Sequence, residues 1–169
     1  MNSQTPHPDT PIPRHPDTLE LGWREWVALP GLGLLALNAK LDTGAATSAL
    51  LALDVERYAD AGAPWVRFRV LPLWPLTAPA VTCGAAVVDE RVVTASSGHA
   101  EVRPVIRTEL RVGVRAGSPA WPVEITLADR RAMAHPMLLG REALAGRALV
   151  DPALEYVLGV VSEPSALYP

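Results

Sequence analysis

Asp42, Thr43 and Gly44 follow an apolar run in the stretch AKLDTGAATSAL, residues 39–50, and are the first candidates for chemistry in this chain. Asp and Gly both favour turns, so the three residues alone are compatible with a simple chain reversal. A carboxylate at the end of a strand, with small residues leaving space beside it, can instead activate a water molecule. The rest of the sequence has to decide between these two interpretations.

The elements that would position Asp42 are short strands separated by turns. Alternating or apolar runs predict strands at residues 23–27, 34–41, 50–58, 65–70, 149–151 and 156–158, and further strands within 85–114 and 119–128. Turn residues predict hairpin connections at 30–33, 59–64, 95–100 and 115–119. The apolar run 137–139 leads through Gly140 into a short helix at 142–147. This pattern predicts an all-β barrel or sandwich with one or two short helices.

Two regions fall outside that pattern. Residues 1–18 contain five prolines and few large apolar side chains, which predicts a disordered tail. Residues 72–84 hold three more prolines and are expected to form a loop or an insertion at a sheet edge. One ordered domain is therefore expected over 19–160, followed by a loose end at 161–169.

The overall composition excludes several classes of function. The chain has 169 residues, of which 49% are hydrophobic and 20% charged, as in globular domains. A formal net charge of −3 gives no reason to expect a nucleic acid or membrane partner. No apolar run is long enough for a spanning helix, and the N-terminus lacks a signal pattern. A cytoplasmic location is the resulting expectation.

Other catalytic chemistries find little support. There is no H-E-x-x-H zinc motif, no phosphate-binding G-x-x-x-x-G-K-[ST] loop and no G-x-S-x-G serine elbow. His99 and His135 are far apart in sequence, and Cys83 with its apolar flanks is expected to be inert core. No metal and no cofactor are therefore expected.

Several blocks taken together resemble the retropepsin-like aspartic proteases. The carriers are LDTGA at 41–45, a candidate flap at 96–99, and LLGR at 138–141. A closer likeness is to a bacterial branch often labelled "ATP-dependent zinc proteases" and linked to RimK-type glutamate ligases. Its features are seen in LGWREWVALPGLG, KLDTGAATSAL, SSGHAEVRPVI, ITLADRRAMAHPMLLGREAL and VDP, which together extend from about Leu21 to Leu158.

The resemblance implies a closed acid-protease barrel and an aspartic endopeptidase. Such enzymes hold one water between two carboxylates that share a proton, because two like charges about 3 Å apart cannot both ionise cheaply. This chain has a single Asp-Thr-Gly, so the second Asp42 is expected from a second copy in a homodimer. By resemblance, Thr43 bonds across the two-fold axis and Gly44 allows close approach to the carboxylate, while Gly140 allows close packing beneath the loop.

Substrate contacts follow from the same resemblance. Ala45 and the flap residues Ser96, Ser97, Gly98 and His99 are expected to meet the peptide, with no nucleic acid or membrane involved. The link to glutamate ligases implies glutamate-rich tails, and Arg91, Arg103 and Arg107 near the flap could bind carboxylates. The alternative is that these arginines pair with Glu101 and Glu109 across the hairpin.

Ala46 departs from the viral members, which usually have Asp there, so Arg141 is expected to lack its usual ion-pair partner. A rival interpretation of the whole chain keeps the fold and removes the chemistry. The same barrel would then be a non-catalytic dimeric peptide-binding module in which Asp42 is only a turn residue.

Overall fold

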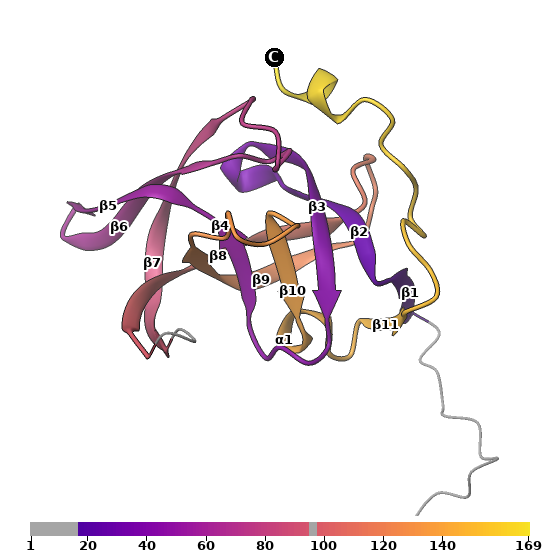
Figure 1. The fold of residues 1–169 in the computed structure, drawn as a ribbon, viewed down its shortest axis with the longest axis horizontal. Coiled ribbons are helices and arrows are strands. Elements are labelled where there is room, and N and C mark those ends of the chain that lie inside the picture. Colours follow the sequence, from indigo (N-terminus) through magenta and orange to yellow (C-terminus); the bar gives the residue numbers. More distant parts are fainter. Residues whose placement is uncertain (1–16, 95–97) are drawn as a thin grey trace, which may run out of the picture.

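The computed structural model describes residues 17–94 and 98–169 (Figure 1). The predicted tail at 1–18 and the flap residues Ser96 and Ser97 therefore lie largely or wholly outside the described residues. Within the described part, the strands are β1 (Leu19–Gly22), β2 (Arg24–Leu29), β3 (Leu34–Asp42), β4 (Ser48–Leu51), β5 (Leu53–Asp60), β6 (Ala63–Val70), β7 (Val81–Thr94), β8 (Ala100–Val112), β9 (Ala120–Ala128), β10 (Met137–Gly140) and β11 (Ala148–Asp151). Helical segments are α1 (Arg141–Leu144) and the 3-10 turns Pro30–Leu32 and Pro164–Leu167.

Six of the described strands close into a barrel, in the order β2-β3-β10-β4-β9-β8. The circle closes where β8 pairs back onto β2, with Val27 opposite Val112. This confirms the predicted all-β fold with a closed barrel and short helices. The alternation in β3 and β9 explains why the barrel forms, because their inward side chains, such as Leu37 and Ile125, are fully buried.

Strand β10 determines where Asp42 lies. It runs parallel to β3 with Gly140 opposite Asp42, and antiparallel to β4 with Met137 opposite Leu50. The connection between β3 and β4, residues 43–47, must therefore pass over the end of β10. Three strands from two distant parts of the sequence thus fix the Asp-Thr-Gly loop.

A second part of the sheet extends away from the barrel (Figure 1). Strands β7, β6 and β5 continue from β8, and β7 pairs with β8 from Val87–Ile106 to Thr94–Ala100. We call this β7–β8 hairpin the flap. In Figure 1 the outer ends of β7 and β8 and the β3–β4 loop lie along the same lower edge of the view.

The proline-rich segment is shorter than predicted. Strand β7 begins at Val81, so residues 81–84 are strand, paired with β6 through Phe68 and Cys83, and not loop. The rest packs onto the protein: Leu71 is buried with Leu51 and Leu53. The Trp74 indole N–H donates to the Met133 carbonyl at 2.9 Å, which ties this segment to the loop before β10.

The C-terminal part differs from expectation for a clear reason. Residues 156–158 are not a strand, because the N–H groups of Val157 and Leu158 donate to the buried Glu25 carboxylate. The expected loose end also makes contacts, since the Tyr168 hydroxyl donates to the Ala36 carbonyl at 2.6 Å. The predicted helix at 142–147 ends earlier, at Leu144. In the described part of the chain, no helix is long and apolar enough to cross a membrane.

Candidate active site

The Asp42 carboxylate is held by the loop that follows it. Its Oδ1 accepts hydrogen bonds from the Gly44 N–H at 3.0 Å and the Ala45 N–H at 3.2 Å. Its Oδ2 lies 3.6 Å from the Lys40 ammonium, and the side chain is 31% exposed. One oxygen is thus oriented by the backbone, while the carboxylate as a whole stays accessible.

Gly140 allows β10 to approach this loop closely. A Cβ at Gly140 would lie 2.5 Å from the Thr47 carbonyl oxygen and 2.8 Å from that of Ala46, closer than real contacts allow. The Gly140 N–H instead donates to the buried Ser48 hydroxyl at 3.1 Å. The close-packing role expected for Gly140 is confirmed.

Arg141 fastens the other side of the loop. Its backbone N–H donates to the Ala45 carbonyl at 2.8 Å, and its Nη1 donates to the Gly44 carbonyl at 3.0 Å. The guanidinium therefore has a backbone acceptor in place of the carboxylate that Ala46 removes. Next along the chain, the Glu142 N–H donates to the Ala46 carbonyl at 3.1 Å.

A depression of about 440 Å³ opens beside Asp42. Its lining combines the cationic or titratable side chains of Lys40, Arg130 and His135 with apolar surface from Trp23, Met133, Ala134 and Leu138. His135 stands edge-on to the Trp23 ring, with centroids 5.8 Å apart. Sequence reasoning did not place any of these residues at the site.

The electrostatics of the depression are positive. Burial lowers the pKa of Arg130, the nearby charge of Arg103 lowers it further, and Asp42 partly opposes both. Burial also lowers the pKa of His135, and the charges of Arg24, Lys40 and Arg130 add to that effect. Asp42 is the acidic residue in this lining, so anionic groups are favoured near it.

Comparisons with known proteins agree with this geometry. A model of the RimB-like family, described as retropepsin-like aspartic endopeptidase RimB, matches residues 20–159. The chain belongs to this family. The resemblance noted from the Asp-Thr-Gly, flap and Leu-Leu-Gly-Arg blocks is thereby confirmed.

Relatives of this RimB-like chain carry a different name. It is 41% identical over 145 residues to a probable alpha-L-glutamate ligase of Desulfotalea psychrophila, and 43% identical over 139 residues to one of Parasynechococcus marenigrum. These matches cover 86% and 82% of the chain, yet the chain spans only about 30% of the length of either relative. A solved structure of a Legionella pneumophila protein of unknown function matches with a TM-score of 0.66 and 27% identity, covering 82% of this chain and 97% of that one.

The predicted flap residues of the RimB-like chain lie where a hairpin places them. Gly98 and His99 are exposed at the flap end, and Gly98 has φ +83°, which suits glycine in a turn. Arg91 and Arg103 are cross-strand neighbours on the flap. Arg103 pairs with Glu101 at 3.0 Å, as the alternative interpretation expected, whereas Arg91 pairs with Glu124 of β9 at 3.2 Å.

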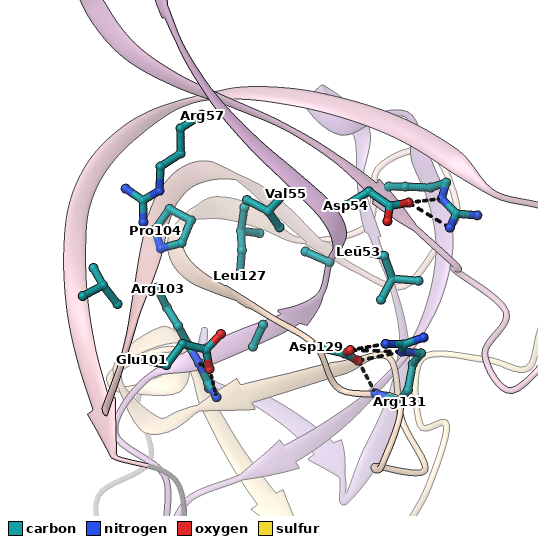
Figure 2. Close-up of a pocket in the computed structure, with 14 residues that line it drawn as sticks. Leu53, Asp54, Val55, Arg57, Glu101, Arg103, Pro104, Leu127, Asp129 and Arg131 are labelled. Carbon is teal, nitrogen blue, oxygen red and sulfur yellow. Dashed lines mark hydrogen bonds and ion pairs between the residues drawn. The ribbon is translucent and has the colours of Figure 1, made fainter. Parts of the chain in front are cut away.

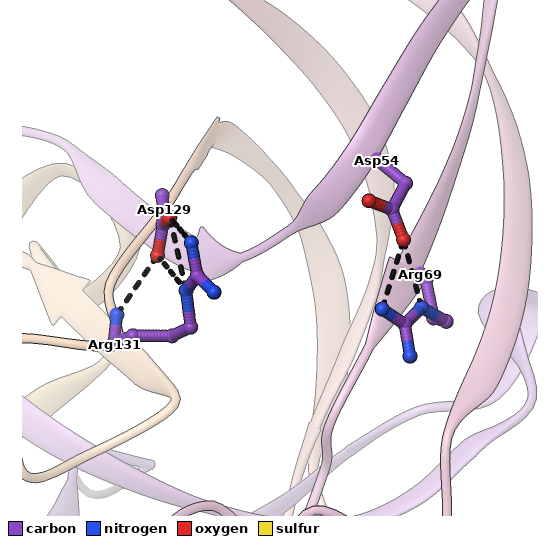
Figure 3. A network of polar contacts seen from close by, with 4 residues as sticks. All are labelled: Asp54, Arg69, Asp129 and Arg131. Atoms are coloured by element: carbon purple, nitrogen blue, oxygen red, sulfur yellow. Dashed lines mark hydrogen bonds and ion pairs between the residues drawn. The ribbon is translucent and has the colours of Figure 1, made fainter.

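A separate pocket of about 370 Å³ lies between the base of the flap and β5 (Figure 2). Its arginines are matched by acids: Arg69 pairs with Asp54, Arg131 with Asp129, Arg103 with Glu101, and Arg57 with Glu90 outside the lining. Figure 3 shows two of these pairs side by side, Asp54–Arg69 and Asp129–Arg131. This pocket is therefore nearly balanced in charge, and Asp42 does not line it.

The remaining candidates for chemistry are inert or unsupported. Cys83 is buried, its thiol donates to the Leu32 carbonyl at 3.4 Å, and burial raises its pKa to about 12. The thiol is therefore protonated at neutral pH, as expected for core. Across residues 17–94 and 98–169, no group of three or more His, Cys, Asp or Glu side chains is arranged to hold a metal ion.

Proposed function

We propose that this chain is an aspartic endopeptidase that works as a homodimer, with one Asp42 from each copy activating a shared water. The observation that carries the proposal is the Asp42 loop. It holds an accessible carboxylate through two backbone N–H groups, and two strands of the barrel brace it. A turn residue with no further role would not need this support.

The dimer follows from the chemistry. Activation of water requires two carboxylates sharing a proton, and the sequence contains one Asp-Thr-Gly. Thr43 and Gly44 are exposed in the single chain, so they are accessible to a second copy. By the family resemblance, each Thr43 would hydrogen-bond across the axis and keep the two Asp42 carboxylates in register.

In the proposed reaction, the ionised Asp42 takes a proton from the water as its oxygen attacks the scissile carbonyl. The protonated Asp42 of the other copy donates its proton to the carbonyl oxygen. Collapse of the tetrahedral intermediate breaks the C–N bond, and the amine leaves with a proton returned from the pair. The flaps of both copies, including Gly98 and His99, would close over the peptide and exclude water.

We further propose that the substrate is acidic, with glutamate-rich tails as the leading candidate. The positive depression beside Asp42 supports this, as do Arg91 and Arg103 on the flap. The relatives named as probable alpha-L-glutamate ligases share this domain within longer chains, which connects the domain to a product that carries glutamate. Ala45 and the flap tip would contact the peptide backbone.

The test combines sedimentation with cleavage of a glutamate-rich peptide on the same sample. The parent protein should sediment as a dimer and cut the peptide, while Asp42→Asn should sediment as a dimer and lose cleavage by at least about a thousandfold. If Asp42→Asn cut as fast as the parent, the peptidase proposal would be wrong. Selective peptide binding without cleavage by the parent would favour the non-catalytic binding module.

A further inference from the structure

Arg130 differs from the arginines around it in having no partner. The Nε of Arg130 is buried, and no hydrogen bond or ion pair of its guanidinium joins it to another described residue. Its neighbour Arg131 is paired with Asp129, and the flap arginines Arg91 and Arg103 are paired with Glu124 and Glu101. A partly buried guanidinium without an anion is costly, so the position of Arg130 requires an explanation.

The chain path aims Arg130 at the site. Asp129 and Arg131 line the charge-balanced pocket behind the flap, whereas Arg130, between them, lines the depression that contains Asp42. Arg130 therefore faces the opposite side from its two neighbours. It is close enough to Asp42 and to Arg103 for both charges to influence it, which places it between the candidate catalytic carboxylate and the flap base.

The shape of the depression matches an acidic side chain with a short aliphatic stem. Trp23, Met133 and Leu138 offer apolar surface, and Lys40 and Arg130 offer positive charge. The Lys40 ammonium already lies 3.6 Å from Asp42, which leaves the guanidinium of Arg130 as the unpaired donor. A guanidinium is well suited to a carboxylate, which it binds in a bidentate geometry.

We propose that Arg130 is the specificity-determining residue of this site and receives the carboxylate of an acidic substrate side chain beside the scissile bond. This inference rests on the proposed function, since it assigns a subsite of the same active site. It ranks the cations: Arg130 dominates selectivity, while Arg91 and Arg103 contribute less because intramolecular acids already occupy them.

The experiment compares two peptides that differ only in having Glu or Gln at the positions flanking the cleaved bond. The value of kcat/KM is measured for the parent, Arg130→Gln and Arg130→Lys, with Arg115→Gln as the matched control. Arg115 is exposed in the β8–β9 turn, at the other end of β8 from the flap tip. Thermal melting of each variant confirms that it is folded.

The parent should prefer the Glu peptide, and Arg130→Gln should lower kcat/KM for that peptide about 10- to 100-fold while changing the Gln peptide little. Arg130→Lys should recover part of the preference, and Arg115→Gln should keep all of it. An equal loss on both peptides, with a shifted pH profile, would instead make Arg130 a residue that positions or charges Asp42. That result, or an unchanged Glu preference in Arg130→Gln, would overturn the proposal.

A binding arm separates this inference from the proposed function. Fluorescently labelled Glu and Gln peptides are titrated into Asp42→Asn protein with and without Arg130→Gln. Preference for the Glu peptide that disappears with Arg130→Gln supports the subsite even if the parent cleaves nothing, in which case only the peptidase proposal fails. Cleavage of both peptides at equal rates by the parent would leave the peptidase proposal intact and refute the subsite.

Discussion

The Asp42 loop and the flap are built on opposite principles. The loop is fixed by contacts from distant segments: β10 lies against it through Gly140, and Arg141 bonds to its backbone. The flap is a two-stranded hairpin with exposed apolar side chains such as Val92 and Val102, fastened by strand pairing and surface ion pairs. This contrast teaches that the candidate chemistry is rigidly positioned, whereas the cover over it remains adjustable.

Replacing Gly140 should break the rigid side of this comparison most severely. In Gly140→Ala, the added Cβ would collide with the backbone of Thr47, and the loop must shift. We expect a loss of about 1–3 kcal/mol in the free energy of unfolding, measured by urea denaturation, together with loss of peptide cleavage. Gly84→Ala is the matched control, because its Cβ would meet its nearest neighbour, the Tyr58 hydroxyl, at an ordinary 3.7 Å. Equal effects at the two glycines would contradict the account.

Arg141 tests the same loop from its other side. Arg141→Ala removes the hydrogen bond from the guanidinium to the Gly44 carbonyl, which lies at the surface. The expected cost is about 0.5–1.5 kcal/mol in stability, with a several-fold drop in kcat/KM because the Asp42 loop loosens. Arg141→Lys should fall between the two proteins. Unchanged cleavage in Arg141→Ala would show that the backbone bonds alone hold the loop.

The flap arginines should matter less than the loop. Arg91→Gln and Arg103→Gln each break an exposed ion pair, and such pairs typically contribute about 0–1 kcal/mol. We expect less than about a threefold change in the preference for Glu over Gln peptides, measured as the ratio of kcat/KM values. A larger change in either variant than in Arg130→Gln would reverse the ranking proposed above.

His135 provides the smallest expected effect, and its sign is set by its surroundings. Burial and the charges of Arg24, Lys40 and Arg130 lower its pKa below the ordinary 6.5, so the unfolded chain binds the proton more readily. Stability should therefore fall as the pH drops below about 6.5 toward the folded-state pKa. His135→Gln should lose less stability than the parent between about pH 7 and pH 5 in denaturation experiments. Identical pH slopes would refute this.

The sequence predicted the features that depend on neighbouring residues. Alternation identified β3, and turn residues identified the hairpin connections before β6, β8 and β9, because local patterns carry this information. The role of Gly140 required the family resemblance, since the clash with Thr47 joins residues far apart in the chain.

Features created by long-range packing were missed. Residues 156–158 have the composition of a strand, but their N–H groups bond to Glu25 from the other end of the chain. Arg130 showed no signal because it is 88 positions from Asp42 and only the fold brings the two together. Lys40 offered a usable one: at two residues before Asp42 on β3, it shares the same strand face.

The central claim is that each active site needs two Asp42 carboxylates, and mixing tests it most directly. Parent and Asp42→Asn proteins are combined at constant total concentration, allowed to exchange subunits, and assayed for cleavage of a glutamate-rich peptide. Random pairing of equal amounts leaves about one quarter of the dimers with both carboxylates, so activity should fall to about a quarter of the parent value, following the square of the parent fraction. A linear fall, to about half, would contradict the account by showing that one Asp42 suffices.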